Sequence, residues 1–228
     1  MRRHLIHWLM AATCMAPALL AAQRDSLPLN RDFRFADGLY LSFEALRNNQ
    51  PDLRTEVLDG RMVALPEEYS LKVERLFPKG RPDIAIPHGQ MYALVFDGIP
   101  YRLTHTDTLR GYSEFSGLRV RGQLSYFEFD TLLVEERLIT AYVPQTGRPF
   151  RQGVIQRESP ATVQRVLDFA SGEEWPLTRE RLLARTQNDP ALKQAIETLP
   201  EDAGLDMLYR CLLIYDDRHP LYLPATTP

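Results

Sequence analysis

The spacing of apolar residues changes once along this chain of 228 residues, and that change constrains the fold more than any single motif does. Up to Leu177 apolar and polar residues tend to alternate, as at Tyr69, Leu71 and Val73, which is typical of strands with one buried face. From Thr178 onward the apolar residues recur at intervals of three and four, as they do on one face of a helix. Strands followed by helices, without regular alternation of the two, predict an α+β fold with a mostly antiparallel sheet.

The first part of the chain predicts about eight strands separated by turns. Strand-like stretches are expected at residues 38–41, 61–65, 69–73, 91–96, 99–103, 118–120, 124–129, 138–143, 154–156 and 162–169. Asp97-Gly98 lies between two of them and is suited to the tight turn of a hairpin, because both positions tolerate a positive φ. Pro100 follows the turn and has no N–H, so its strand is expected to lie at an edge or to carry a bulge there.

About three helices are predicted in the second part. Thr178 can cap the first, Asp189-Pro190 is a typical helix start, and Pro220 ends the last. A further short helix is expected at residues 43–47 behind Ser42. The predicted organisation is a signal peptide at residues 1–22, a linker or edge strand at 23–36, a β-rich body at 37–177 and a C-terminal helical segment at 178–228 that packs on the body.

The first 22 residues have the three parts of a secretory signal peptide. Arg2 and Arg3 form a positive start, an apolar stretch runs from Leu5 to Leu20, and Ala22 offers a small residue for cleavage. The apolar stretch is short for a membrane-spanning helix, which needs about 20 residues. We therefore expect export to the periplasm or the cell exterior, by the general or the twin-arginine route, with no membrane-spanning segment after cleavage.

Composition and charge agree with a soluble folded protein and argue against nucleic acid as a partner. Hydrophobic residues make up 44% of the chain and charged residues 25%. Loss of residues 1–22 leaves 25 basic and 30 acidic residues, whereas nucleic-acid-binding surfaces are usually basic. Cleavage also leaves Cys211 as the only cysteine, in an apolar run, so we expect a buried thiol and no internal disulfide.

No local motif predicts catalytic residues, metal ligands or a cofactor. Ser113 lacks the second glycine of a nucleophile elbow, and the histidines form no metal-binding pair. Glu128 and Asp130 are two residues apart on a predicted strand, hence on one face, and such a pair can act as acid and base. Exposed acids opposite a buried strand face are the more ordinary explanation of this spacing.

Aromatic residues are frequent in the middle of the chain, and some of them could line a ligand-binding face. With the two carboxylates, the residues that we select as candidates for contact with a ligand are Tyr92, Tyr101, Tyr112, Tyr126, Glu128 and Asp130. Packing in the core is the competing explanation for the aromatic members of this set.

The segment Asp37–Phe43, the Asp97-Gly98 hairpin and the tail His219–Pro224 together resemble a family of predicted secreted bacterial envelope proteins with no known activity. The resemblance spans most of the chain after residue 22, and each of its elements is common turn or cap chemistry. It implies a protein of a Gram-negative envelope, and it carries no catalytic residues to this sequence.

These features favour an exported envelope protein with a non-enzymatic role, which binds a protein or a small ligand through its β-rich part. An envelope hydrolase or glycan-active enzyme that uses Glu128 and Asp130 is the alternative. A third hypothesis is a structural subunit, which would pair an exposed sheet edge with another chain.

Overall fold

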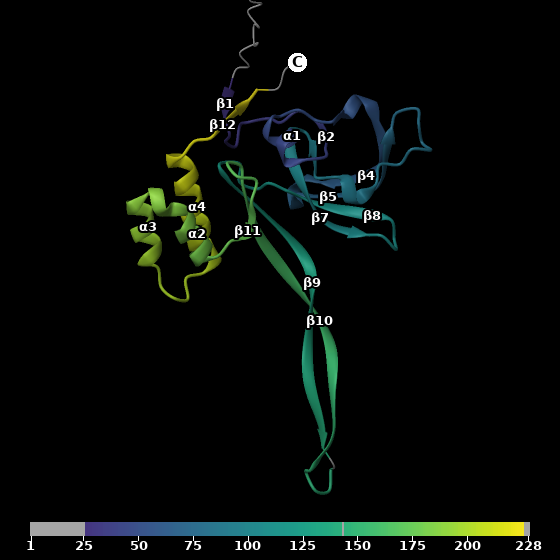
Figure 1. The fold of residues 1–228 in the computed structure, drawn as a ribbon, viewed down its shortest axis with the longest axis vertical. Coiled ribbons are helices and arrows are strands. Elements are labelled where there is room, and N and C mark those ends of the chain that lie inside the picture. The colour runs from purple at the N-terminus through teal and green to yellow at the C-terminus, as the bar shows by residue number, and fades with distance from the viewer. Residues whose placement is uncertain (1–25, 143, 226–228) are drawn as a thin grey trace, which may run out of the picture.

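The computed structural model describes residues 26–142 and 144–225, so the expected signal peptide lies outside the described residues. The described chain is an α+β fold with antiparallel sheets, as the sequence predicts. It has three parts: a curled sheet, one very long hairpin that projects from the body, and a helical layer near the C-terminus (Figure 1).

The curled sheet has seven strands in the order β3-β2-β6-β7-β8-β5-β4. Their bounds are β2 Gly38–Tyr40, β3 Leu53–Arg54, β4 Leu58–Leu65, β5 Ser70–Pro78, β6 Ala93–Phe96, β7 Ile99–Asp107 and β8 Tyr112–Gly117. The helix α1, Phe43–Arg47, follows β2 and is capped by the Ser42 hydroxyl, as expected. Asp97 and Gly98 join β6 to β7 with φ values of 52° and 69°, which confirms the predicted turn.

The prediction for Pro100 is wrong, because β7 lies inside the sheet between β6 and β8. The bulge in β7 falls between Leu103 and His105, away from the proline. The proline is tolerated because the ladder with β8 begins one residue later, at Tyr101. On the side of β7 that faces β8, the carbonyl of Pro100 accepts a hydrogen bond of 2.9 Å from the Leu118 amide. An N–H at residue 100 is therefore not needed on this side.

The long hairpin is the main departure from the sequence prediction. Residues 124–129 and 138–143 are expected as two strands, but β9 runs unbroken over Leu124–Tyr142. The expected strands at 154–156 and 162–169 are likewise parts of one strand, β10, over Pro149–Asp168. A short strand β11, Glu174–Pro176, pairs with the inner end of β10. The expected strand at 118–120 is reduced to a single bridge between Val120 and Tyr126.

Charged residues explain why the strands look shorter in the sequence. Glu135, Glu136 and Arg137 interrupt the apolar pattern of β9 and resemble a turn. Pro160 does the same in β10. In a ribbon exposed on both sides, however, charges do not disturb the backbone pairing, and the two strands stay in register over almost their whole length.

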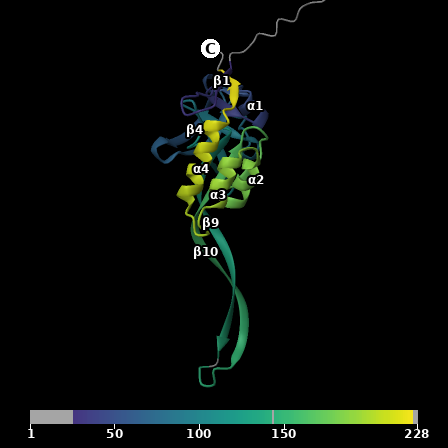
Figure 2. The same ribbon diagram turned by 90° about the vertical axis from the view of Figure 1, so that its left-hand side faces the viewer.

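The helical layer follows the predicted caps and consists of α2 Arg179–Arg185, α3 Pro190–Glu197 and α4 Leu205–Arg218 (Figure 2). Thr178 caps α2 and Asp189 caps α3 through their side-chain oxygens. Cys211 is buried in α4, as expected, and burial raises the pKa of its thiol. After α4 a short strand β12, Tyr222–Pro224, pairs with β1, Ser26–Pro28, and brings the two ends of the described chain together.

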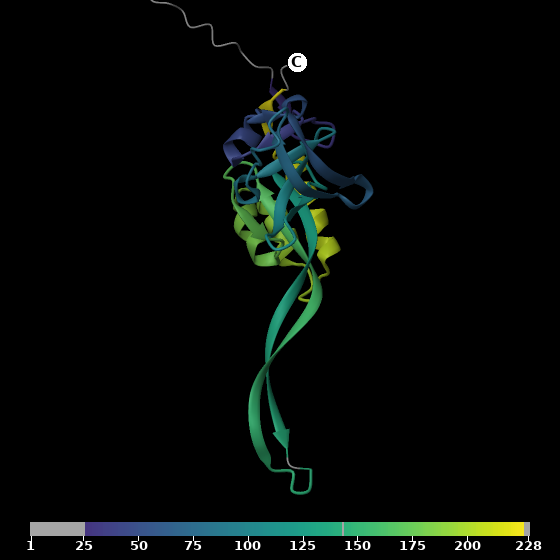
Figure 3. The ribbon, with the colours of Figure 1, turned by 90° about the vertical axis from the view of Figure 1, so that its right-hand side faces the viewer.

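The base of the hairpin lies between the two other parts of the molecule (Figure 1), and the curled sheet lies in front of it in Figure 3. On one of its faces Leu124, Tyr126 and Val166 pack in a core with the helices. On the opposite face Phe127 and Leu167 pack in a second core with β2, β6 and the segment before β2. A third core fills the curled sheet itself. Both faces of the hairpin are therefore buried at its base.

We predict that a side chain in place of Gly122, just before β9, destabilises the packing of α4 on this junction. A Cβ there would overlap Oδ2 of Asp216 on α4, although the backbone conformation itself is unstrained. Gly122→Ala should lower the free energy of unfolding by about 1–3 kcal/mol, because the helix must move away. Chemical denaturation measures the loss.

Gly153→Ala is the matched control, because a Cβ at Gly153 meets nothing within 4 Å. This second variant should be as stable as the parent protein or slightly more stable. Equal stability of the two variants would contradict the described packing of α4 on the start of β9.

Candidate functional site

The four tyrosines selected from the sequence do not form one ligand-binding face. Tyr101 is buried in the core of the curled sheet, and Tyr126 is buried under the helices. Tyr92 packs at the edge of the second core, where burial raises the pKa of its phenol to about 12. Tyr112 is partly exposed, with the Lys72 ammonium 3.5 Å from its ring centroid. Core packing accounts for most of this aromatic set.

The two selected carboxylates do lie together, in a cleft beside the base of the hairpin. Glu128 and Asp130 share one face of β9, and the cleft between them and the curled sheet has a volume of about 620 Å³. The lining residues of the cleft include five acids, Glu67, Glu68, Glu114, Glu128 and Asp130, and one base, Arg119. The cleft is therefore strongly acidic.

Both carboxylates already have partners within the protein. Glu128 accepts a hydrogen bond of 2.5 Å from the Tyr126 hydroxyl and lies 3.1 Å from the guanidinium of Arg119. Burial and the adjacent carboxylate raise the pKa of the Tyr126 phenol above its ordinary value, so this hydroxyl is a donor. Asp130 accepts a 2.7 Å hydrogen bond from Thr162, its neighbour across the hairpin. These contacts hold the point at which the hairpin leaves the body.

Two further aspartates fix the helices to this base. Asp168, at the end of β10, is fully buried and forms an ion pair with Arg185 of α2. Asp216 of α4 accepts a 2.8 Å hydrogen bond from the amide of Leu124, the first residue of β9. Its other oxygen is buried without a partner among the described residues, and burial raises the pKa of this carboxyl to about 7.

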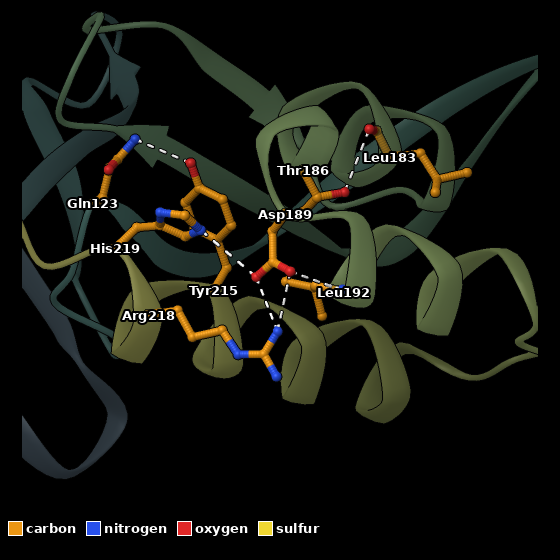
Figure 4. A network of polar contacts seen from close by, with 8 residues as sticks. All are labelled: Gln123, Leu183, Thr186, Asp189, Leu192, Tyr215, Arg218 and His219. Atoms are coloured by element: carbon orange, nitrogen blue, oxygen red, sulfur yellow. Dashed lines mark hydrogen bonds and ion pairs between the residues drawn. The ribbon is translucent and has the colours of Figure 1, made fainter.

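A network around Asp189 holds the helices to each other (Figure 4). Its carboxylate accepts a hydrogen bond from the Leu192 amide, which caps α3, and pairs with both Arg218 and His219 at the end of α4. The capping bond and Arg218 lower the pKa of Asp189. Tyr215 of α4 bonds Gln123, just before β9, so the network also reaches the base of the hairpin.

Beyond Asp130 and Thr162, none of the described residues outside the hairpin covers either of its faces; we call residues 131–161 the arm (Figure 1). At about 3.3 Å per residue, its strands extend roughly 40 Å from the base. Eight of the twenty exposed large hydrophobic side chains in the described residues belong to the arm. They are Leu132, Leu133, Val134, Leu138, Ile139, Tyr142, Val154 and Ile155.

The two faces of the arm differ in exposure and in charge. Residues that face each other in the hairpin have numbers that sum to 292, so the even-numbered residues share one face. On that face Leu132, Val134, Leu138, Tyr142 and Val154 are 55–63% exposed, against 43–46% for the three apolar side chains of the odd face. Among the paired residues of the arm, the charged side chains of the even face, Glu136 and Glu158, are acidic, whereas the odd face carries mostly arginine.

Charge also changes along the arm. From residue 137 to residue 157 the chain contains four arginines and no acidic residue. The far half of the arm, including its tip at Arg148, is therefore basic, whereas the cleft at its base is acidic. The arm is not among the candidates that the sequence suggests, although apolar residues on both faces of β9 and β10 are a signal for it.

Other site classes have less support among the described residues. No group of three or more His, Cys, Asp or Glu side chains in this part of the chain is arranged to hold a metal ion. No helix among residues 26–142 and 144–225 is long and apolar enough to cross a membrane. Comparisons with protein-family models, with curated proteins and with solved structures found no match to this chain.

We predict that Asp216 makes stability depend on pH. A folded-state pKa of about 7, above the ordinary 3.8, means that the folded protein holds this proton more tightly than the unfolded chain does. The contribution to stability is therefore present at low pH and is lost as the pH rises from about 4 through about 7, by up to a few kcal/mol.

Asp216→Asn tests this directly, because the amide keeps the acceptor for Leu124 and cannot ionise. Urea unfolding of both proteins should give similar stability near pH 3, where the carboxyl is protonated in the folded and the unfolded protein alike, and the variant should be the more stable one near pH 8. If both proteins lose stability over this range in parallel, then Asp216 does not titrate as described.

Proposed function

We propose that this chain is an exported, non-enzymatic interaction protein of a bacterial envelope, and that the arm is the element by which it binds another protein. The observation that carries the proposal is the uncovered apolar surface on both faces of the arm. Contiguous exposed apolar surface on a folded protein usually marks a binding site, because its contact with water is unfavourable. The signal peptide predicted at residues 1–22 and the resemblance to secreted envelope proteins support the proposed location.

The shape of the arm favours a protein partner over a small ligand. Small ligands are usually bound in concave pockets that bury most of their surface. A projecting two-stranded ribbon instead offers long faces and free backbone edges, which suit another protein surface or an added strand. An isolated two-stranded hairpin is also only marginally stable in water, so a binding partner would stabilise the arm.

The alternative, an envelope hydrolase that uses Glu128 and Asp130, has weaker support. Glu128 is engaged by Tyr126 and Arg119, and Asp130 by Thr162, so each has a structural role at the base of the arm. Hydrolysis of an envelope polymer by the parent protein, with its loss in Glu128→Gln, would favour this alternative.

The arm should be removable without loss of the fold. Phe169 donates a hydrogen bond to Gln123, so the odd-numbered pairs of the hairpin are its hydrogen-bonded pairs. An Asn-Gly turn in place of residues 132–160 would therefore close the hairpin between Thr131 and Ala161. Because the three cores lie outside the deleted part, we expect the same melting temperature within a few degrees.

The same variant should bind much less of a fluorescent dye that reports exposed apolar surface. A body that fails to fold without residues 132–160 would show that the arm is part of the fold, and would count against a binding role.

Photo-cross-linking tests the proposal in the cells that produce the protein. A photoreactive amino acid in place of Leu138, on the arm, should give protein adducts. The matched control replaces Leu109, which is 98% exposed but lies on a turn of the body between β7 and β8. Adducts at Leu138 only are expected. Lipid adducts, or equal labelling at both positions, would contradict an arm that binds protein.

A further inference from the structure

The outer edge of β9 is open along the arm. Near the base, Tyr126 uses its N–H and C=O to bond Val120 and Arg119, on the side away from β10. The register of the hairpin shifts only between Pro149 and Arg151, so every even-numbered residue of β9 up to Thr140 directs its backbone groups to the same side. Beyond Asp130 no strand among the described residues pairs with this edge.

The outer edge of β10 is less suited to pairing. Even-numbered residues of β10 direct their backbone groups to this outer edge. Pro160 is one of them and has no N–H, so the row of backbone donors along the edge is interrupted there. Proline is a common means by which proteins prevent strand addition at an edge. Between Thr131 and Tyr142, β9 contains neither proline nor glycine. Of the two edges of the arm, β9 is therefore the one that can accept a strand.

We propose that the strand that pairs with this edge is β9 of a second copy, antiparallel to the first and related to it by a two-fold axis at Glu136. The inference rests on the proposed function of the arm and names its partner. A two-fold arrangement makes the interface closed and self-complementary, and it produces a four-stranded sheet from two arms.

The side chains select this register. With the axis at Glu136, the paired residue numbers sum to 272, so Glu135 faces Arg137 of the second copy, and this pair occurs twice. Leu133 faces Ile139 and Val134 faces Leu138, again twice each. Opposite charges and apolar pairs directly across an antiparallel sheet are stabilising. A shift of the axis by one residue loses both Glu135–Arg137 pairs and places Glu135 or Arg137 opposite its own copy. With the axis at Glu136, the two opposite-charge pairs are kept, and the like-charge contact is that of Glu136 with its own copy.

Charge at the two ends of the arm gives independent support. In this register Tyr142, the last residue of β9, lies opposite Asp130 of the other copy. The tip of each arm, with Arg148 and Arg151 and no acidic neighbour, therefore reaches the acidic cleft at the base of the other arm. Electrostatic attraction between tip and cleft favours the antiparallel arrangement over a parallel one.

Analytical ultracentrifugation of residues 23–228, which include all described residues, tests the proposal. We expect a concentration-dependent dimer. Arg137→Glu and Glu135→Arg should each weaken it by about tenfold or more, because each places like charges opposite one another at two positions. A mixture of the two variants should recover the affinity, because an acidic side chain then faces a basic one again at both positions.

Mixing changes neither protein, so recovery cannot come from repair of a folding defect. Glu158→Arg is the control, because it makes the same charge change on β10, away from the proposed edge, and should leave the dimer unchanged. A monomer at all concentrations, or no recovery on mixing, would overturn the inference. The proposed function would still stand if Leu138 in the cross-linking experiment gave adducts with a different protein.

A cysteine scan tests the register separately. Residues that face each other as a hydrogen-bonded pair have Cα atoms about 5.5 Å apart, which a disulfide can span. Glu136→Cys should therefore form a disulfide-linked dimer rapidly. Leu138→Cys should form one slowly, because in this register position 138 faces Val134 of the second copy and not its own equivalent. Cys211 is buried and does not compete. Equal rates at the two positions would contradict an axis at Glu136.

Discussion

Burial of the hairpin base on both faces is the constraint on which the rest of the structure depends. The helices cover one face through Leu124, Tyr126 and Val166, and the core beneath the curled sheet covers the other through Phe127 and Leu167. A two-stranded ribbon does not hold its shape alone in water. Here buried side chains hold the strands between the two cores from Leu124 to Phe127 and from Val166 to Asp168, and the arm continues the same pairing outward. The body therefore holds the arm in place at its base.

The sequence is sufficient for the parts of this fold that local chemistry determines. The caps at Ser42, Thr178 and Asp189 each satisfy a backbone donor within three residues, and Asp97-Gly98 sets its own turn, so these elements can be predicted without tertiary information. The carboxylates Glu128 and Asp130 could also be placed on one face from their spacing alone. The cleft that they line could not, because its other residues come from distant strands of the curled sheet.

The arm escapes sequence analysis for a physical reason. Sequence patterns assume that a strand has a buried face and ends where that pattern is interrupted. In β9 the charged segment at Glu135 to Arg137 faces water in a ribbon that has no buried face, so it interrupts the pattern without ending the strand. Pro160 looks like a strand end for a similar reason, although at an open edge its missing N–H costs nothing. Where both sides of a strand are exposed, pairing and not periodicity determines its length.

An arm with apolar faces and an open edge is an aggregation hazard unless its association has a limit. Pairing of β9 with β10 of the next copy would add copies without end, whereas a two-fold pair of β9 strands occupies the edge of each copy once and closes. The blocked edge at Pro160 then prevents the four-stranded sheet from growing through β10. Glu136 at the axis faces its own copy, which weakens the pair. This repulsion makes the proposed dimer weaker than its apolar and opposite-charge pairs alone would make it, in keeping with an association that depends on concentration. The proline at the second edge would then limit the proposed assembly to two copies.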